Sequence, residues 1–205
     1  FDDKVRTFCS NPGGFVSSEY YDNNLAVVNG HSYKVIKSNN TNFALLVSQK
    51  FTEPFNSPLE FGKHVADMAN MLTQHKILVQ RFGDLVRGRR TTPERLFRNN
   101  IIPTLKDAVP GDLSLVLPYR IMTDIIEMIQ ALDKVSPGLA SDETLLYGVE
   151  VKFYSNKIKV NNGFRTDTIK NLFVGGDGAG ITRGLMQASV NGVLMAREIL
   201  KVDNA

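Results

Sequence analysis

The sequence predicts an α+β protein in two parts. Residues 1–165 are expected to form a mixed β-sheet domain with about three helices, and residues 166–205 a strand, a glycine turn and a helix. Two observations carry this prediction. Short apolar and alternating runs come early, and amphipathic helical spacing recurs later. Near the C-terminus, an apolar triplet leads into a glycine-rich turn that precedes a helical pattern.

The predicted strands are short runs separated by turn residues. Residues 5–8 and 25–28 lie at spacings typical of β-hairpins. Residues 43–48 form an unbroken apolar run, which predicts a fully buried strand. Residues 144–154 alternate apolar and polar side chains, as a half-buried strand does. The polar loop at residues 38–42 is open to two interpretations, a substrate-binding loop or an ordinary turn.

Three predicted helices have recognisable starts or periodicity. Ser57, Pro58 and Glu60 match a capping residue, a first helical position and a capping box. A short helix begins near Pro93 in the same way. Residues 119–134 repeat apolar side chains at helical spacing, which predicts an amphipathic helix with one face in the core.

The main candidate site is the turn after residues 172–174, which are read as a buried strand. Four glycines surround one carboxylate, Asp177. A strand, a glycine turn and a helix bring backbone N–H groups and the positive end of a helix close to a ligand. Asp177 can accept hydrogen bonds from ligand hydroxyls, whereas a phosphate loop needs no such group. The alternative interpretation is an ordinary strand–helix turn. The candidate cofactor-binding residues are Gly175, Gly176, Asp177, Gly178, Ala179, Gly180, Ile181, Thr182 and Arg183.

This turn does not match the dinucleotide fingerprint G-x-G-x-x-G. Ile181 and Arg183 stand where the third glycine belongs. A dinucleotide-binding unit also needs a second strand and an acidic ribose ligand about 20 residues further on. The sequence stops at Ala205, before such a strand, so a protein that binds NAD(P) alone is disfavoured.

The run from Asn171 to Arg197 resembles the C-terminal FAD motif of flavoproteins built on two dinucleotide-binding domains. In that motif a strand ends in Gly-Asp, and the Asp holds the ribityl chain of FAD. With two further segments, residues 5–14 and 147–154, the chain resembles the uncharacterised FAD-dependent (NAD/FAD-utilising) dehydrogenases. The resemblance implies a substrate-side domain inserted into an FAD domain. The N-terminal ADP-binding unit of that family is absent from this sequence.

What the resemblance implies for function is a C-terminal piece of an FAD-dependent oxidoreductase, inactive alone. Asp177 would hold the ribityl hydroxyls, and the amides following Gly178 and Gly180 would face the flavin, with Thr182 and Arg183 adding donors. FAD is expected in the full-length protein and not on this fragment. The expected partner is the missing N-terminal FAD-binding segment of the same chain. The small-molecule substrate and the catalytic residues are not identified.

A second group of candidates could contact substrate: Cys9, Arg87, Arg89 and Arg90. Cys9 is interpreted either as a thiol beside the flavin or as a small buried hydrophobe. The basic stretch between Arg81 and Arg98 fits a substrate anion site, an RNA-binding patch or a solvated loop. A non-catalytic module that binds RNA or protein through this stretch is therefore the alternative function. Nucleic acid is the less favoured partner, because Phe82 alone offers a ring for stacking within residues 81–90.

Composition excludes several classes of protein. The net charge is +3, and 42% of the residues are hydrophobic, as is ordinary for a globular protein. No apolar run approaches the ~20 residues of a membrane span. His64 and His75 lack a third ligand nearby, so no metal site is predicted. A single cysteine and no visible signal peptide favour a cytoplasmic protein. The start at Phe1, without Met, is interpreted as the interior of a longer chain.

Overall fold

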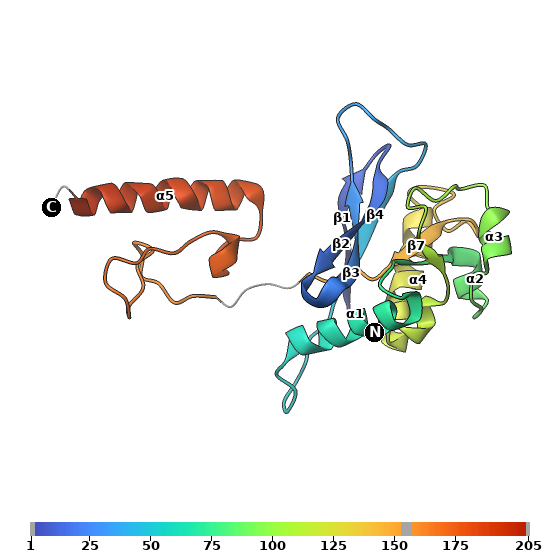
Figure 1. The fold of residues 1–205 in the computed structure, drawn as a ribbon, viewed down its shortest axis with the longest axis horizontal. Coiled ribbons are helices and arrows are strands. Elements are labelled where there is room, and N and C mark those ends of the chain that lie inside the picture. The colour runs from blue at the N-terminus through green and yellow to red at the C-terminus, as the bar shows by residue number, and fades with distance from the viewer. Residues whose placement is uncertain (1–2, 153–156, 204–205) are drawn as a thin grey trace. The chain divides into compact units, whose positions relative to one another are not determined.

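The computed structural model describes residues 3–152 and 157–203, and the chain separates into two compact units (Figure 1). Unit 1 comprises Phe1–Val151 and unit 2 comprises Lys152–Ala205. The predicted boundary at residues 165–166 lies inside unit 2. The assignment of the last forty residues to an FAD domain stays a prediction.

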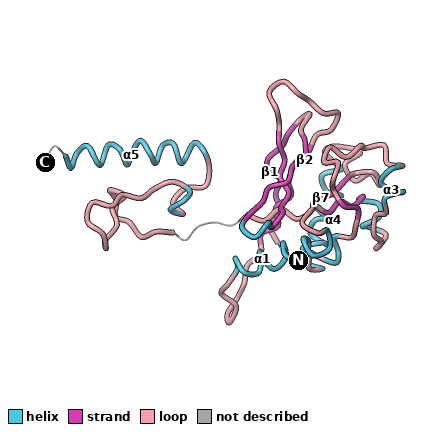
Figure 2. Tube along the Cα trace, viewed as in Figure 1, coloured by secondary structure: helices cyan, strands magenta, loops and turns pink. Residues whose placement is uncertain are grey.

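The first four strands of unit 1 form two antiparallel ribbons (Figure 2). The strands are β1 (Lys4–Asn11), β2 (Phe15–Tyr21), β3 (Leu25–His31) and β4 (Asn42–Ser48). A hairpin forms between β2 and β3, so the hairpin prediction is confirmed for residues 25–28. It is wrong for residues 5–8, because β1 pairs with the distant β4. β4 is half-buried, so the prediction of a fully buried strand was wrong. In the described part of the chain β4 has a ladder partner on one side only, and its side chains are not enclosed.

A third sheet is small and mixed. β5 (Leu78–Arg81) lies between β6 (Val109–Pro110), which is parallel to it, and β7 (Leu145–Gly148), which is antiparallel. The predicted strand at residues 144–154 is thus shorter, and its last part at residues 153–154 lies outside the described residues.

All three predicted helices form: α1 (Pro58–Thr73), α3 (Pro93–Phe97) and α4 (Tyr119–Asp133). Pro occupies the first turn of α1 and α3, and Thr92 caps α3 through its side chain. The capping box at the start of α1 is wrong, because Ser57 makes no side-chain cap hydrogen bond. A short helix, α2 (Phe82–Val86), occupies a stretch interpreted only as basic sequence. The α+β class is confirmed.

The core of unit 1 joins the ribbons to the third sheet. Ala26, Val28 and Ile77 form a buried apolar cluster. The Val28 amide donates to the Val149 carbonyl at 3.0 Å, which ties β3 to the segment after β7. Helix α1 is fixed to β3 by the buried side chain of Asn70.

Unit 2 contains isolated bridges, a single turn of 3₁₀-helix at Asp177–Ala179, and the long helix α5 (Leu185–Asp203). One prediction was wrong here. Residues 172–174 make one bridge, between Arg165 and Phe173, and Leu172 is 38% exposed, so this is not a buried strand. The helix predicted after the glycine turn forms as α5, which begins at Leu185.

Candidate functional site

The glycine turn of unit 2 has a backbone that demands glycine. Gly176 has φ +73° and ψ −167°, and Gly180 has φ +69°. L-residues rarely adopt either conformation. The Gly176 amide donates to the buried side chain of Asn191 on α5 at 2.7 Å. A Cβ at Gly175 would lie 2.4 Å from the same Asn191 oxygen. The turn is therefore anchored to α5 through one amide.

Asp177 is exposed at this turn. Its Oδ1 atom accepts hydrogen bonds from the Thr182 hydroxyl and, at 3.4 Å, from the Gly184 amide. These bonds hold the carboxylate against the loop between the turn and α5. A carboxylate in this setting can accept a hydrogen bond from a ligand hydroxyl.

Three amides of the turn are used within it. Gly180 donates to the Asp177 carbonyl at 3.0 Å, and Ile181 and Thr182 donate to the Gly176 carbonyl at 3.2 and 3.4 Å. The amide of Ile181, predicted to face a ligand, is therefore engaged inside the protein in this conformation. The first-turn amides of α5, from Leu185 onward, have no acceptor within the helix and carry the positive end of its dipole.

The turn leaves open space beside Asp177. A Cβ added at Gly176, Gly178 or Gly184 would meet no atom within 4 Å. The sequence thus places one exposed carboxylate, exposed Arg183 and half-buried Thr182 around an uncovered backbone. This arrangement fits a polyhydroxy group, whose hydroxyls need acceptors and whose chain needs room.

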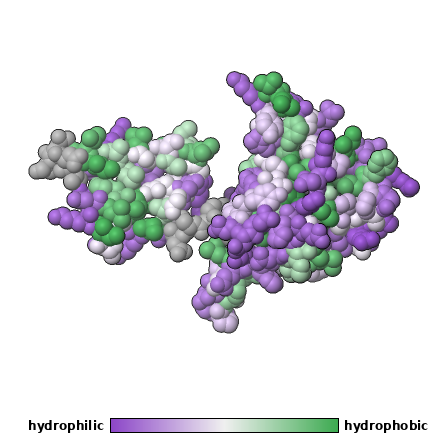
Figure 3. Space-filling view, viewed as in Figure 1, coloured by the Kyte–Doolittle hydropathy of each residue, from purple (hydrophilic) through white to green (hydrophobic). Residues whose placement is uncertain are grey.

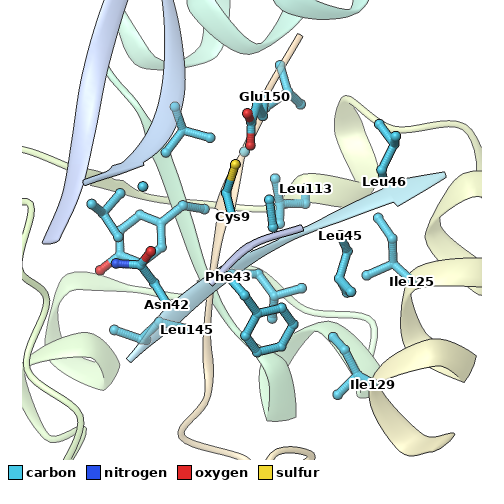
Figure 4. A pocket seen from close by; sticks show the side chains of 18 of the residues that line it. Cys9, Asn42, Phe43, Leu45, Leu46, Leu113, Ile125, Ile129, Leu145 and Glu150 are labelled. Carbon is cyan, nitrogen blue, oxygen red and sulfur yellow. The ribbon is translucent and has the colours of Figure 1, made fainter. Parts of the chain in front are cut away.

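Unit 1 contains a separate feature, a cavity of about 710 Å³ (Figure 4). Its walls come from β1, β3, β4 and β7 and from helices α1 and α4. Most of the side chains that line it are apolar, and they include Phe43, Leu45, Ile125, Ile129 and Leu145. This cavity was not predicted from the sequence, although the apolar run of β4 and the apolar face of α4 are the signals that locate it.

Cys9 lies at the irregularity in the pairing of β1 with β4 and lines the cavity. It is exposed and has φ +51°. Its interpretation as a small buried hydrophobe was therefore wrong. A role for its thiol in substrate binding stays a prediction.

The predicted arginine site is largely engaged in ion pairs. Arg87 contacts Asp142 at 2.7 Å, and Arg89 contacts the fully buried Asp84 at 2.8 Å. The hydrogen bond from Arg87 lowers the pKa of Asp142. Thr91 donates to the other Asp84 oxygen, so this network holds the loop after α2 in place. Arg90 is exposed, and no ion pair of its side chain occurs among the described residues. The ion pairs of Arg87 and Arg89 reduce the positive charge that they offer to a substrate anion, and the substrate role of Arg87, Arg89 and Arg90 stays a prediction.

Two other classes of feature are missing from the described ranges. No group of three or more His, Cys, Asp or Glu side chains there could hold a metal ion. No helix there combines the length and the apolar character of a membrane span.

Residues 2–153 match the family described as "FAD-dependent protein, C-terminal domain-like". The chain belongs to this family. The match covers nearly all of unit 1, whereas the glycine turn lies beyond it. A protein of Clostridium beijerinckii, described as uncharacterized, is 30% identical over 207 residues, which cover 96% of this chain. The chain spans 38% of the length of that relative.

Proposed function

We propose that this member of the FAD-dependent protein family is the C-terminal part of an FAD-dependent oxidoreductase. Unit 1 is the substrate-side domain, and the turn in unit 2 is the ribityl and isoalloxazine half of the FAD site. The observation that carries the proposal is the exposed Asp177 carboxylate on an open glycine turn, in a chain of this family. The partner is the N-terminal FAD-binding segment of the same protein.

FAD supplies the redox chemistry when it is bound, and the protein supplies binding and orientation. Asp177 accepts hydrogen bonds from ribityl hydroxyls, and Thr182 fixes the orientation of that carboxylate. The positive end of α5 favours negative charge near its first turn. Glycine at positions 176 and 178 keeps side chains out of the space that the cofactor needs.

The test uses the full-length protein that contains this chain. We expect Asp177→Ala to weaken FAD retention by tenfold or more, because a hydrogen bond to a charged group contributes about 1.5–3 kcal/mol. The matched control is Asp167→Ala, which removes another exposed carboxylate of unit 2, one paired with Lys159 at 3.4 Å. Flavin absorbance after desalting measures the result.

Unchanged flavin content in Asp177→Ala would remove this residue from the site. The chain of residues 1–205 alone should retain no stoichiometric flavin. Purified chain that carries one FAD per molecule would contradict the assignment of half a site.

The alternative function, a module that binds RNA or protein through Arg81–Arg98, gains no support from the geometry. Arg87 and Arg89 are already paired with carboxylates, which lowers the positive charge that this surface offers to a phosphate backbone.

A further inference from the structure

We propose that unit 1 binds a neutral, largely apolar small molecule with a carbonyl oxygen, in the cavity between β4 and α4. The inference concerns unit 1 alone and does not depend on flavin binding. Every residue that lines the cavity lies within residues 9–151.

The size and the walls of the cavity suit such a ligand. Its volume of about 710 Å³ falls within the ~300–1,000 Å³ typical of small-molecule pockets. The side chains of Phe43 and Leu45 on β4 and of Ile125 on α4 are only half-buried, although core side chains of this kind are normally enclosed. In Figure 4 they surround open space. Filling that space would remove apolar surface from water, which favours binding.

An aromatic cluster adjoins the cavity at α1 and the loop before it. The ring of Phe51 lies 4.9 Å from that of Phe55 and 5.1 Å from that of Phe61, measured between centroids. Phe51 and Phe61 also line the cavity. Aromatic rings at this wall favour a ligand with flat or ring-shaped apolar parts.

The proposal assigns the polar contact to Asn42, one of the residues that line the cavity. Its Oδ1 accepts a hydrogen bond from Asn11 Nδ2 at 2.9 Å, which fixes the orientation of the amide. Its Nδ2 atom is buried and has no hydrogen-bond partner. A Cβ at Gly30 would lie 2.5 Å from the Asn42 oxygen, so glycine leaves the room that this amide occupies. Because buried polar groups are nearly always paired, a ligand acceptor is expected here.

Three other polar side chains around the cavity have protein partners. Thr144 donates to the Leu139 carbonyl at 2.7 Å, Asn40 donates to the Ile102 carbonyl at 2.8 Å, and the Thr104 hydroxyl accepts from the Val16 amide at 3.0 Å. The residues that line the cavity include a glutamate, Glu150, and no Lys, Arg or His. A carboxylate ligand would thus find no counter-charge, whereas a neutral carbonyl can accept from Asn42.

The test titrates the whole chain with 6-propionyl-2-(dimethylamino)naphthalene, a neutral carbonyl probe whose emission brightens and shifts to the blue in apolar surroundings. The comparison probe carries a propyl group in place of the propionyl group. We expect saturable binding of the carbonyl probe, about fivefold tighter than binding of the propyl analogue, as one neutral hydrogen bond gives.

Two variants locate the probe. Ile125→Trp fills the cavity and should weaken binding by tenfold or more, whereas Ile102→Trp, at a site 74% exposed and outside the lining, should bind as the wild type does. The chain has no tryptophan, so each variant also reports on its own environment by fluorescence. If Ile125→Trp loses its circular dichroism spectrum, Leu45→Phe replaces it as the filling variant.

Asn42→Leu and Asn42→Asp should both abolish the preference for the carbonyl probe. Asn42→Asp retains an oxygen for Asn11, so the loss common to both variants reports the missing donor. Absence of saturable binding would overturn the proposal. So would binding that Ile125→Trp leaves unchanged, because probe on the exposed apolar side chains of α5 is insensitive to that change. Equal affinity of wild type for the two probes would overturn the carbonyl assignment.

Discussion

Tyr147 shows how its surroundings change the chemistry of one side chain. It packs against the buried cluster of Ala26, Val28 and Ile77, and it lines the cavity. Burial raises the pKa of its hydroxyl, because the phenolate would lose hydration. The unfolded-state pKa is about 10. The folded state is therefore favoured by this group below pH ~10, and that contribution is lost as the pH rises toward the folded-state pKa.

An alkaline titration followed by tyrosine absorbance checks this sign. The chain has six tyrosines, and we expect one to ionise later than the rest, or only on unfolding. Tyr147→Phe should remove the late step. The control Tyr20→Phe, at a site 55% exposed, should keep it. Six tyrosines that titrate together near pH ~10 would contradict the burial of Tyr147.

Residue types alone could not reveal the roles of Asn42 and Asp84. Asparagine in a polar loop is usually a turn residue, and the sequence left residues 38–42 open to that interpretation. What distinguishes Asn42 is its contact with Asn11, which depends on the pairing of β1 with β4. Asp84 lies in a basic stretch of the sequence. Its burial and its ion pair with Arg89 depend on the formation of α2, which the sequence did not predict.

Between elements, one side chain joins α1 to β3. Asn70 Oδ1 accepts from the Ala26 amide at 2.8 Å, and its Nδ2 donates to the Ala26 and Ala66 carbonyls at 2.8 Å. All of these groups are buried. Asn70→Ala would leave the Ala26 backbone without side-chain partners, and each unsatisfied buried group costs about 1–3 kcal/mol.

We expect Asn70→Ala to lower the free energy of unfolding by about 2–5 kcal/mol, measured by urea denaturation. Met71→Ala, on the same helix at a site 74% exposed, is the control and should change it by about 0.5 kcal/mol or less. Hydrogen exchange at the Ala26 amide should also accelerate in Asn70→Ala. A loss of stability equal to that of Met71→Ala would show that α1 is held to β3 by apolar packing alone.

The elements were predicted best where local chemistry decides them. Pro58 and Pro93 mark helix starts because proline suits the first turn and no later position. Residue type alone does not identify the inward face of α1: Leu72 is 43% exposed, whereas the polar Asn70 is buried. Asn70 is inside because β3 offers it backbone partners, and such long-range pairing leaves no mark on the periodicity.

The predictions of strand burial were wrong for the same reason, because burial depends on contacts with elements that are distant in the sequence. Residues 43–48 and 172–174 are both apolar runs, and both were expected to be enclosed. An apolar run shows that a strand can be buried, whereas the neighbouring elements decide whether it is. β4 faces a cavity, and Phe173 makes one bridge, so neither run is enclosed in the described part of the chain.

At the scale of the whole molecule, the two units differ in how much they bury. Unit 1 has a core that includes Val27, Ile77 and Val79, each at most 1% exposed. In the described part of unit 2, Ala179 and Asn191 are the buried side chains. Its helix α5 leaves Leu185 at 91% exposure, and apolar side chains gather on the visible face of unit 2 in Figure 3.

This difference predicts different behaviour for the separated units. We expect residues 1–151 to fold alone with a cooperative urea transition, because their core is internal and folding is driven by buried apolar surface. They should also bind the carbonyl probe as the whole chain does. We expect residues 152–205 alone to lack a cooperative transition and to self-associate, because association would bury exposed apolar side chains such as Leu185, Met186 and Val193.

Circular dichroism in urea and sedimentation of each piece measure these outcomes. The control is the whole chain under the same conditions. Its urea unfolding curve should include a transition at the same urea concentration as that of residues 1–151. A cooperative, monomeric unit 2 would show that its few buried contacts suffice. It would also show that α5 needs no further apolar cover.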